Sequence, residues 1–257
     1  MIAFRDVWHH HGMKPTLRGV SFEARAGELT CVMGENGVGK TTLLRIAAGV
    51  TPCTEGEARV DGIVRRSTLE AEREVRAKVA YLPAEAWLPK ANTGREFLHA
   101  TGLLHAVPEG RMMRHIEQLL RVFHLDGEQA ISGYSTGQQK KIALAGAFVT
   151  DAPVLILDEP LSGGLDTSGT LAAVRILEHL AADRGRTILM AVPVAELVER
   201  FADRVVLLGP EGVVAQGSPA ELMTAAGDAG SLSEAVANLL RPERGEEMRE
   251  YLAEEAG

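Results

Sequence analysis

The residues best suited to chemistry form a glycine-rich segment, GENGVGKTT at 34–42, which fits the pattern G-x-x-x-x-G-K-[ST]. Glycines let the backbone turn tightly, so that successive N–H groups point at phosphate oxygens. In such a loop the Lys40 ammonium contacts the β- and γ-phosphates of a nucleotide, and the Thr41 hydroxyl binds Mg²⁺. This segment, here called the phosphate loop, predicts a nucleoside-triphosphate site formed by Gly34, Asn36, Gly37, Gly39, Lys40, Thr41 and Thr42.

Two acids follow a run of four apolar residues, VLIL at 154–157. The run predicts a buried strand that delivers Asp158 and Glu159 to its C-terminal end, where α/β sheets place their ligands. We expect Asp158 to hold Mg²⁺ through water and Glu159 to polarise the attacking water, a role that contributes about 10²–10⁴ in rate. The alternative is that the strand simply ends in two solvated acids. The presence of the phosphate loop in the same chain makes this alternative the less favoured interpretation.

A third segment, YSTGQQKK at 134–141, opens the apolar helical stretch IALAGAF. Ser135 is a natural helix N-cap, and Gly137 permits close approach of a phosphate. On its own this segment is equally well explained as an ordinary helix start.

The elements that must position these residues alternate between short apolar runs and segments of helical periodicity, which is typical of an α/β protein. Strands are expected at 2–7, 18–24, 28–33, 57–64, 78–82, 153–158, 186–192, 204–209 and 212–216. Helices are expected at 40–48, 68–76, 94–105, 110–124, 136–150, 168–183, 194–201, 218–226 and 231–240. The phosphate loop then joins a strand to a helix, which is the context that phosphate binding requires.

Composition excludes several classes of protein. The 257 residues are 46% apolar and 24% charged, the balance of a soluble globular protein, and the net charge of −8 argues against a nucleic-acid binder with a broad basic surface. No segment reaches the ~18–20 apolar residues that cross a membrane, and the N-terminus has no apolar signal region. Two cysteines form no disulfide framework, and Cys31 is expected in the core of a cytoplasmic protein.

In this order and over this length, the three segments resemble the ATP-binding subunit of an ABC transporter. The resemblance covers residues 1–217 and implies a P-loop NTPase (RecA-like) core with an antiparallel β edge. It also implies a helical subdomain at about 87–150, followed by a helical C-terminal tail at 218–257. Its ligands would be ATP and Mg²⁺, and its active form a dimer with two ATP sites at the interface.

In that family each site pairs the phosphate loop of one subunit with the signature helix of the other. The resemblance makes 134–141 this chain's signature segment, so Ser135, Gly137 and Gln138 would contact the γ-phosphate held by a partner subunit. Asp166 resembles the aspartate of the D-loop, although that loop is one residue longer here. LSGGL at 161–165 resembles the usual signature motif, but it comes after Asp158 and Glu159 in the sequence. It is therefore interpreted as a decoy, a chance match without the role of a signature motif.

Two switch positions depart from the family pattern. Ala84 stands where the family has the glutamine of the Q-loop, with Glu85 and Asn92 as candidates to replace it. Pro193 stands where the family has the switch histidine, and the nearest histidine, His179, belongs to the preceding helix. Since a preorganised donor at a developing charge contributes about 10²–10³ in rate, we expect firm Mg-ATP binding and weak hydrolysis at this chain's own site.

The adenine-stacking aromatic is a third departure. Its place is taken by His11, with Trp8 as a second candidate. The run His9-His10-His11 also invites a metal interpretation, but consecutive residues of an extended chain point to alternate faces and do not form a compact ligand set.

The resemblance implies partners as well as ligands. Separate transmembrane permease subunits would dock near 81–98, and TGRE at 93–96 resembles exporter-type members. The second ATP-binding subunit would be either a copy of this chain or a more ordinary ATPase, and no nucleic acid is expected. The chain would then lie peripherally on the cytoplasmic face of the membrane. Two alternatives stay open, a soluble ABC ATPase without a membrane partner and a non-catalytic regulatory subunit that uses ATP to hold a dimer together.

Overall fold

A six-stranded sheet forms the centre of the molecule, in the order β10-β9-β3-β8-β7-β6. The computed structural model describes residues 1–12 and 14–241. The strands are β3 (Leu29–Met33), β6 (Val79–Leu82), β7 (Val154–Asp158), β8 (Thr187–Ala191), β9 (Arg204–Gly209) and β10 (Gly212–Gly217). All neighbours pair in parallel except β9 and β10. The parallel strands β3, β7 and β8 are buried at every residue, which explains their unbroken apolar runs.

A second, antiparallel sheet has the order β2-β1-β4-β5 and supplies the expected antiparallel part of the fold. Its strands are β1 (Ile2–His11), β2 (Lys14–Ala24), β4 (Glu55–Val60) and β5 (Ile63–Val64). The prediction of one strand at 57–64 was wrong, because Asp61 and Gly62 have positive φ angles of 47° and 81° and turn the chain back. Asp-Gly between apolar residues is a strong hairpin signal, so the sequence contained this turn.

The helix α1 (Lys40–Ala47) lies between the two sheets, and its Leu43 and Leu44 share one apolar core with residues of both. α6 (Thr167–Ala182) and α7 (Ala195–Phe201) belong to a second core on the other face of the large sheet. Alternation along β7 explains the division, since Ile156 joins the first core and Leu155 and Leu157 the second.

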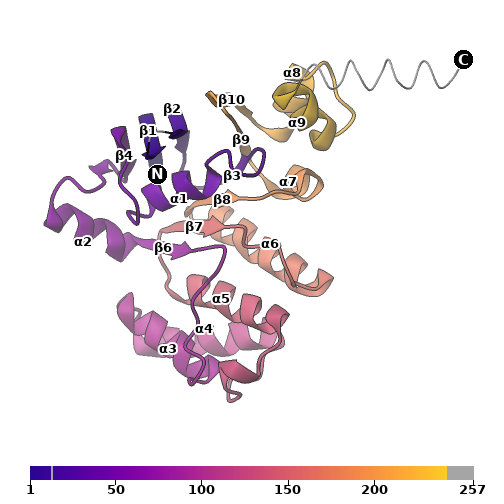
Figure 1. Ribbon diagram of the computed structural model, residues 1–257. Helices are drawn as coiled ribbons and strands as arrows, with labels where there is room; N and C mark the ends of the chain where they lie inside the picture. Colours follow the sequence, from indigo (N-terminus) through magenta and orange to yellow (C-terminus); the bar gives the residue numbers. More distant parts are fainter. Residues whose placement is uncertain (13, 242–257) are drawn as a thin grey trace, which may run out of the picture.

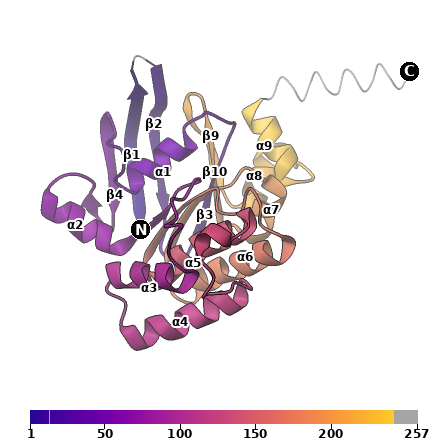
Figure 2. The same ribbon diagram turned by 60° about the horizontal axis from the view of Figure 1, so that its bottom comes forward.

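The segment between β6 and β7 is helical, as predicted. It contains α3 (Gly94–Leu104), α4 (Glu109–Val122), the short 3₁₀ helix at Ile131–Gly133 and α5 (Thr136–Val149). Both views place α3, α4 and α5 together at the end of the molecule away from β1, β2 and β4 (Figures 1 and 2). α3 begins at a capping box, in which Thr93 and Glu96 satisfy each other's backbone N–H groups.

The remaining helices are α2 (Leu69–Lys78), α8 (Pro219–Ala225) and α9 (Leu232–Leu240). α8 and α9 pack on each other beside β9 and β10, far from α3 and α4 (Figure 2). The end of the predicted tail, 242–257, lies outside the described residues. Cys31 is fully buried, as expected of a core residue, and within residues 1–12 and 14–241 no helix is long and apolar enough to span a membrane.

Candidate nucleotide-binding site

The phosphate loop connects β3 to α1, and its shape depends on two glycines. A Cβ atom at Gly34 would lie 2.2 Å from the carbonyl oxygen of Leu208, and one at Gly39 would lie 2.6 Å from the Leu17 side chain. Both glycines also have positive φ, 148° and 108°. No side chain caps α1, so its first N–H groups stay open to an anion at the positive end of the helix dipole.

Lys40 lies within this loop with only 6% of its surface exposed. Its ammonium donates hydrogen bonds to the carbonyl oxygens of Gly34 and Glu35, at 2.8 and 2.9 Å. Burial lowers the pKa of Lys40, and the carboxylates of Glu159 and Asp158 offset part of that shift. The charge is therefore held at the mouth of the loop by weak acceptors that a phosphate can replace.

Thr41 and Asp158 meet at the C-terminal end of β7. The Thr41 hydroxyl donates to Oδ1 of Asp158 at 3.3 Å, while Oδ2, also buried, has no hydrogen-bond partner within residues 1–12 and 14–241. Burial raises the pKa of Asp158, and the bond from Thr41 offsets part of this rise. A buried carboxylate oxygen without a partner is costly, and a hydroxyl beside a carboxylate is an oxygen ligand set that suits Mg²⁺. The side-chain oxygens of Thr41 and Asp158 are therefore suited to bind the expected Mg²⁺.

Glu159 follows β7 with a left-handed φ of 47°, which is uncommon for a residue other than glycine. Its N–H donates to the carbonyl oxygen of Ala191 at 3.1 Å, and its own carbonyl accepts from the Lys140 ammonium at 2.8 Å. The Ser162 hydroxyl lies 3.2 Å from Oε2 and also contacts the Glu159 carbonyl. Backbone and side chain of Glu159 are thus both fixed beside Asp158, at the end of β7 that faces Lys40 and Thr41.

The signature segment begins α5 with a capping box. The Ser135 hydroxyl accepts from the N–H of Gln138 at 3.3 Å, and Oε1 of Gln138 accepts from the N–H of Ser135 at 2.9 Å. Ser135 is exposed. Between described residues, no hydrogen bond joins Ser135, Gly137 or Gln138 to the phosphate loop of the same chain.

Asp166 lies against the signature helix and caps α6. Its Oδ1 accepts from the N–H of Gly169 at 2.7 Å, and the Lys141 ammonium lies 3.0 Å from its Oδ2. The Lys141 hydrogen bond, more than the one from Gly169, holds the pKa of Asp166 below its usual range. A Cβ atom at Gly137 would lie 2.5 Å from the carbonyl oxygen of Gly164, so the loop before Asp166 packs directly on the signature helix.

The two switch positions are exposed. Ala84 lies in a bend after β6, and Pro193 follows β8 two residues after Ala191, the residue that holds the Glu159 backbone. His179 points elsewhere, because it lies near the C-terminal end of α6 with its Nδ1 2.6 Å from Asp183. The two candidates to replace the glutamine, Glu85 and Asn92, also make no contact with the nucleotide site among the described residues. Glu85 is exposed, and the Asn92 amide contacts Glu96 at 3.5 Å.

His11 ends β1 as an exposed side chain whose ring lies edge-on to that of His9, with 5.0 Å between ring centroids. His9 is buried, and its Nδ1 lies 3.0 Å from the carbonyl oxygen of Pro52. Trp8 stacks on His10 and donates to Asp6 at 3.1 Å. His11 is therefore the most exposed ring of the group, as an adenine-stacking residue would need to be.

Sequence reasoning missed four residues of the site. Lys140 and Lys141 tie the signature helix to Glu159 and Asp166, and Ser162, which belongs to the segment interpreted as a decoy, contacts Glu159. Two adjacent lysines after a helix cap were the available signal for the first pair. Arg241 bonds Glu35 of the phosphate loop from the end of α9, and no local pattern indicates that contact.

The sequence is also similar to that of known proteins. A family model described as ABC transporter matches residues 17–162, more than half of the chain. A putative ABC transporter ATP-binding protein of Streptomyces avermitilis is 32% identical over 88% of this chain and 42% of the relative. The Nod factor export ATP-binding protein I of Rhizobium meliloti is 33% identical over 85% of this chain and 64% of the relative. This chain thus spans less than two thirds of the length of either.

A solved structure, titled as the ATP binding subunit of an ABC transporter, superposes with a TM-score of 0.85 and 26% identity. The match covers 93% of this chain and 99% of that one. This similarity confirms the predicted α/β fold, with its P-loop core, antiparallel sheet and helical elements.

Proposed function

Because this chain belongs to the ABC transporter family, we propose that it binds Mg-ATP and works as the ATPase subunit of a transporter. The observation that carries the proposal is the meeting of Lys40, Thr41 and Asp158 around a loop that only glycines can form. N–H groups of the loop and of the first turn of α1 would bind phosphate oxygens. Lys40 would exchange its two carbonyl acceptors for phosphate, which is the stronger acceptor because it is charged.

Thr41 and Asp158 would hold Mg²⁺, which neutralises phosphate charge when bound. Glu159 is placed to orient a water molecule at the same edge, and its carboxylate would take the proton as the water oxygen bonds to the γ-phosphorus. The bond from that phosphorus to the β-phosphate oxygen breaks, which leaves ADP and phosphate. Ser162 keeps the carboxylate in place through its 3.2 Å contact.

We propose that the complete site forms between two subunits. Ser135, Gly137 and Gln138 would contact the γ-phosphate held by the partner, and Asp166 would lie at the same interface. The support is that the signature segment presents the exposed Ser135 while making no hydrogen bond to its own phosphate loop, among described residues. Lys140 and Lys141 would transmit partner contact to Glu159 and Asp166, because each belongs to the signature helix and bonds one of those residues.

Hydrolysis at this chain's own site is proposed to be weak. Pro193 lies two residues after Ala191, whose carbonyl accepts from the Glu159 N–H, and it has no side-chain donor; Ala84 has none either. Loss of one preorganised donor costs about 10²–10³ in rate, whereas phosphate binding uses the loop and Lys40 and is unaffected. A more ordinary ATPase subunit as the partner would then carry most of the turnover.

The transport role is proposed from the family and from the surface near 81–98. Trp87 is 83% exposed in this segment, an unusual position for so large an apolar side chain and one that a membrane partner would cover. Export, rather than import, is supported by TGRE at 93–96 and by the similarity to the Nod factor export ATP-binding protein of Rhizobium meliloti. The chain would then lie peripherally on the membrane, bound to separate permease subunits.

Isothermal titration with Mg-ATP tests the binding proposal. Lys40→Ala should abolish binding, while Lys78→Ala, which changes a half-buried lysine on α2 paired with Glu74, should leave it unchanged. Equal affinity in both variants would refute the proposed site.

Copurification from detergent-solubilised native membranes, read by mass spectrometry, tests the transport role. Recovery of a permease with a second ATPase subunit supports the asymmetric transporter, and recovery of a permease alone supports a homodimer. A preparation without any membrane protein would contradict the transporter and favour a soluble ABC ATPase.

A further inference from the structure

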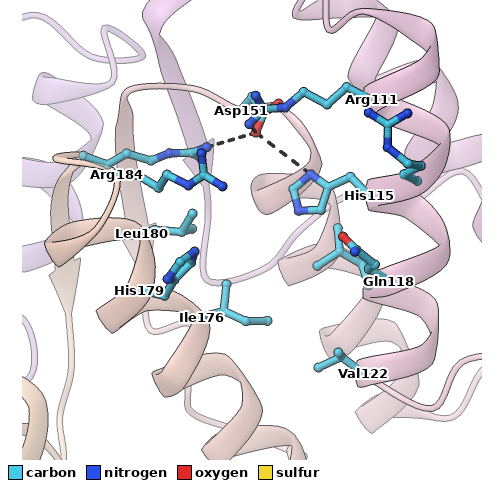
Figure 3. A pocket seen from close by; sticks show the side chains of 12 residues that line it. Arg111, His115, Gln118, Val122, Asp151, Ile176, His179, Leu180 and Arg184 are labelled. Carbon is cyan, nitrogen blue, oxygen red and sulfur yellow. Dashed lines mark hydrogen bonds and ion pairs between the residues drawn. The ribbon is translucent and has the colours of Figure 1, made fainter.

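A hollow of about 610 Å³ lies between α4 and α6, at the segments that lead into β7 and β8 (Figure 3). We call it the arginine pocket; it is lined by Arg111, Arg114, His115, Gln118, Leu119, Val122, Asp151, Ile176, His179, Leu180, Arg184 and Arg186. β7 and β8 run parallel, so their N-terminal ends share one edge of the sheet. The phosphate loop and Asp158 lie at the opposite edge, about one strand length of roughly 15 Å away. The pocket is therefore separate from the nucleotide site.

Among the described residues, the lining of the arginine pocket contains four guanidinium groups and one carboxylate, that of Asp151. Asp151 accepts from Arg186 at 2.9 Å and is paired with Arg111, and its Oδ1 lies 4.0 Å from Nδ1 of His115 (Figure 3). Arg114 and Arg184 are exposed and add two further positive charges to the rim. One carboxylate cannot balance four guanidinium groups, so the pocket keeps an excess of positive charge.

The innermost guanidinium is incompletely satisfied. Arg186 is only 7% exposed, and while one of its terminal nitrogens bonds Asp151, Nη1 is buried and has no hydrogen-bond partner among the described residues. A buried charged donor without an acceptor is costly, so a small turn of the Arg186 side chain toward an anionic oxygen in the pocket would be favourable. This second observation points to a ligand independently of the charge on the rim.

The pocket also has an apolar wall, to which both α4 and α6 contribute. Figure 3 shows Val122 at the end of α4 and Ile176 and Leu180 on α6, on either side of the hollow, with the ring of His179 beside them. Arginine binds phosphate through paired N–H groups, and pockets of about 300–1,000 Å³ are the usual size for small ligands. The combination fits a phosphate group joined to an apolar or aromatic body better than it fits a bare ion.

We propose that the arginine pocket binds a phosphate ester with an apolar body, with the phosphate on Arg186, Arg184 and Arg114 and the body on the α4–α6 wall. Such a ligand would be either a soluble phosphorylated metabolite or the headgroup of an acidic phospholipid. The proposal does not depend on ATP binding, because it uses no residue of the phosphate loop.

Titration with 1-naphthyl phosphate tests the proposal. Full-length protein should bind it, and the double variant Arg114→Ala/Arg184→Ala should lose at least about tenfold in affinity, since each exposed guanidinium removed takes away a charge-assisted contact. Both residues are exposed, so folding should survive the change. Arg186→Gln should lose binding as well. The matched control is Arg121→Ala/Arg175→Ala, which removes two exposed arginines from α4 and α6 that do not line the pocket.

Equal loss in the control double variant, or loss of binding in Lys40→Ala, would overturn the proposal, because the anion would then bind through general charge or at the phosphate loop. Absence of binding to the wild-type protein would overturn it too. Sedimentation with phosphatidylglycerol vesicles distinguishes the two sources. Vesicle binding that falls in Arg114→Ala/Arg184→Ala supports a lipid headgroup, and naphthyl phosphate binding without vesicle binding supports a soluble ligand.

Discussion

Arg241 and Glu35 are 206 positions apart in the sequence and are joined by two contacts, with Nε 2.6 Å from Oε1 and Nη2 2.8 Å from Oε2. Glu35 belongs to the phosphate loop, and Arg241 directly follows α9. The pair therefore links the C-terminal helices to the loop that is proposed to hold ATP. The Arg241 guanidinium also forms an ion pair with Glu35, whose side chain is the one carboxylate within that loop.

Arg241→Ala should weaken ATP binding about two- to fivefold, the scale expected of an exposed ion pair. Without the positive charge of Arg241 nearby, the Glu35 carboxylate would repel the phosphates more strongly, and the difference would be larger at low ionic strength. Titration with Mg-ATP at low and high salt measures this. Arg241→Lys should restore most of the affinity, and a variant Arg241→Ala that binds ATP as tightly as the wild type at low salt would show that the link has no electrostatic role.

Asp158→Asn should lower Mg-ATP affinity at least about tenfold while leaving metal-free ATP binding nearly unchanged, because the carboxylate is proposed to act through Mg²⁺. Burial raises the pKa of Asp158, so its charged form is disfavoured by the fold, and the amide should not reduce the thermal stability. Paired titrations with Mg²⁺ and with EDTA separate these effects. Equal loss under both conditions would assign Asp158 a role in shaping the loop rather than in holding metal.

Glu159→Gln should preserve ATP binding and abolish the remaining hydrolysis, since the amide cannot take a proton from water. The variant should accumulate as an ATP-bound dimer, measurable by size-exclusion chromatography with light scattering. Ser162→Ala, which removes the 3.2 Å contact to the carboxylate, should reduce turnover by a smaller factor. Hydrolysis at the wild-type rate in Glu159→Gln would exclude this carboxylate as the base.

The double variant Ala84→Gln/Pro193→His should raise ATP turnover about 10-fold or more, because it supplies donors at two positions where the chain has none. Steady-state phosphate release measures the effect, with Pro193→Ala as the control for loss of the proline ring. Turnover that stays low in the double variant, with folding intact, would mean that these positions do not limit hydrolysis.

Asp151→Asn should destabilise the fold by about 2 kcal/mol at pH 7, because Arg186 loses its charged acceptor. Burial alone would raise the pKa of Asp151, but hydrogen bonds from Arg111 and Arg186 hold it below its usual range. A depressed folded-state pKa contributes stability above the unfolded value near ~3.9, and this contribution disappears as the pH falls through the folded value. Urea unfolding measured from pH 7 downward should show the free energies of unfolding of the wild type and of Asp151→Asn converging below about pH 4. A difference between the two that stays constant down to pH 3 would refute this assignment.

The sequence by itself determined the chain order of strands and helices and the place of the phosphate loop. These features are local: apolar runs, helical periods, and glycines at 34 and 39 whose backbone geometry leaves no room for a side chain. Helix ends were nearly right because caps such as Thr93 and Ser135 act within one turn. The hairpin at Asp61 was missed although its signal was equally local.

Tertiary structure alone decided which distant residues meet. The strand order places β7 two positions from β3, so that Thr41 contacts Asp158 across 117 residues, and it directs α9 back to Glu35. It likewise gathers Arg111 of α4 and Asp151 and Arg186, from the loops before β7 and β8, into one pocket. Such contacts depend on how sheets and helices pack, which no short stretch of sequence encodes, because burial of the shared core and not local propensity fixes the arrangement.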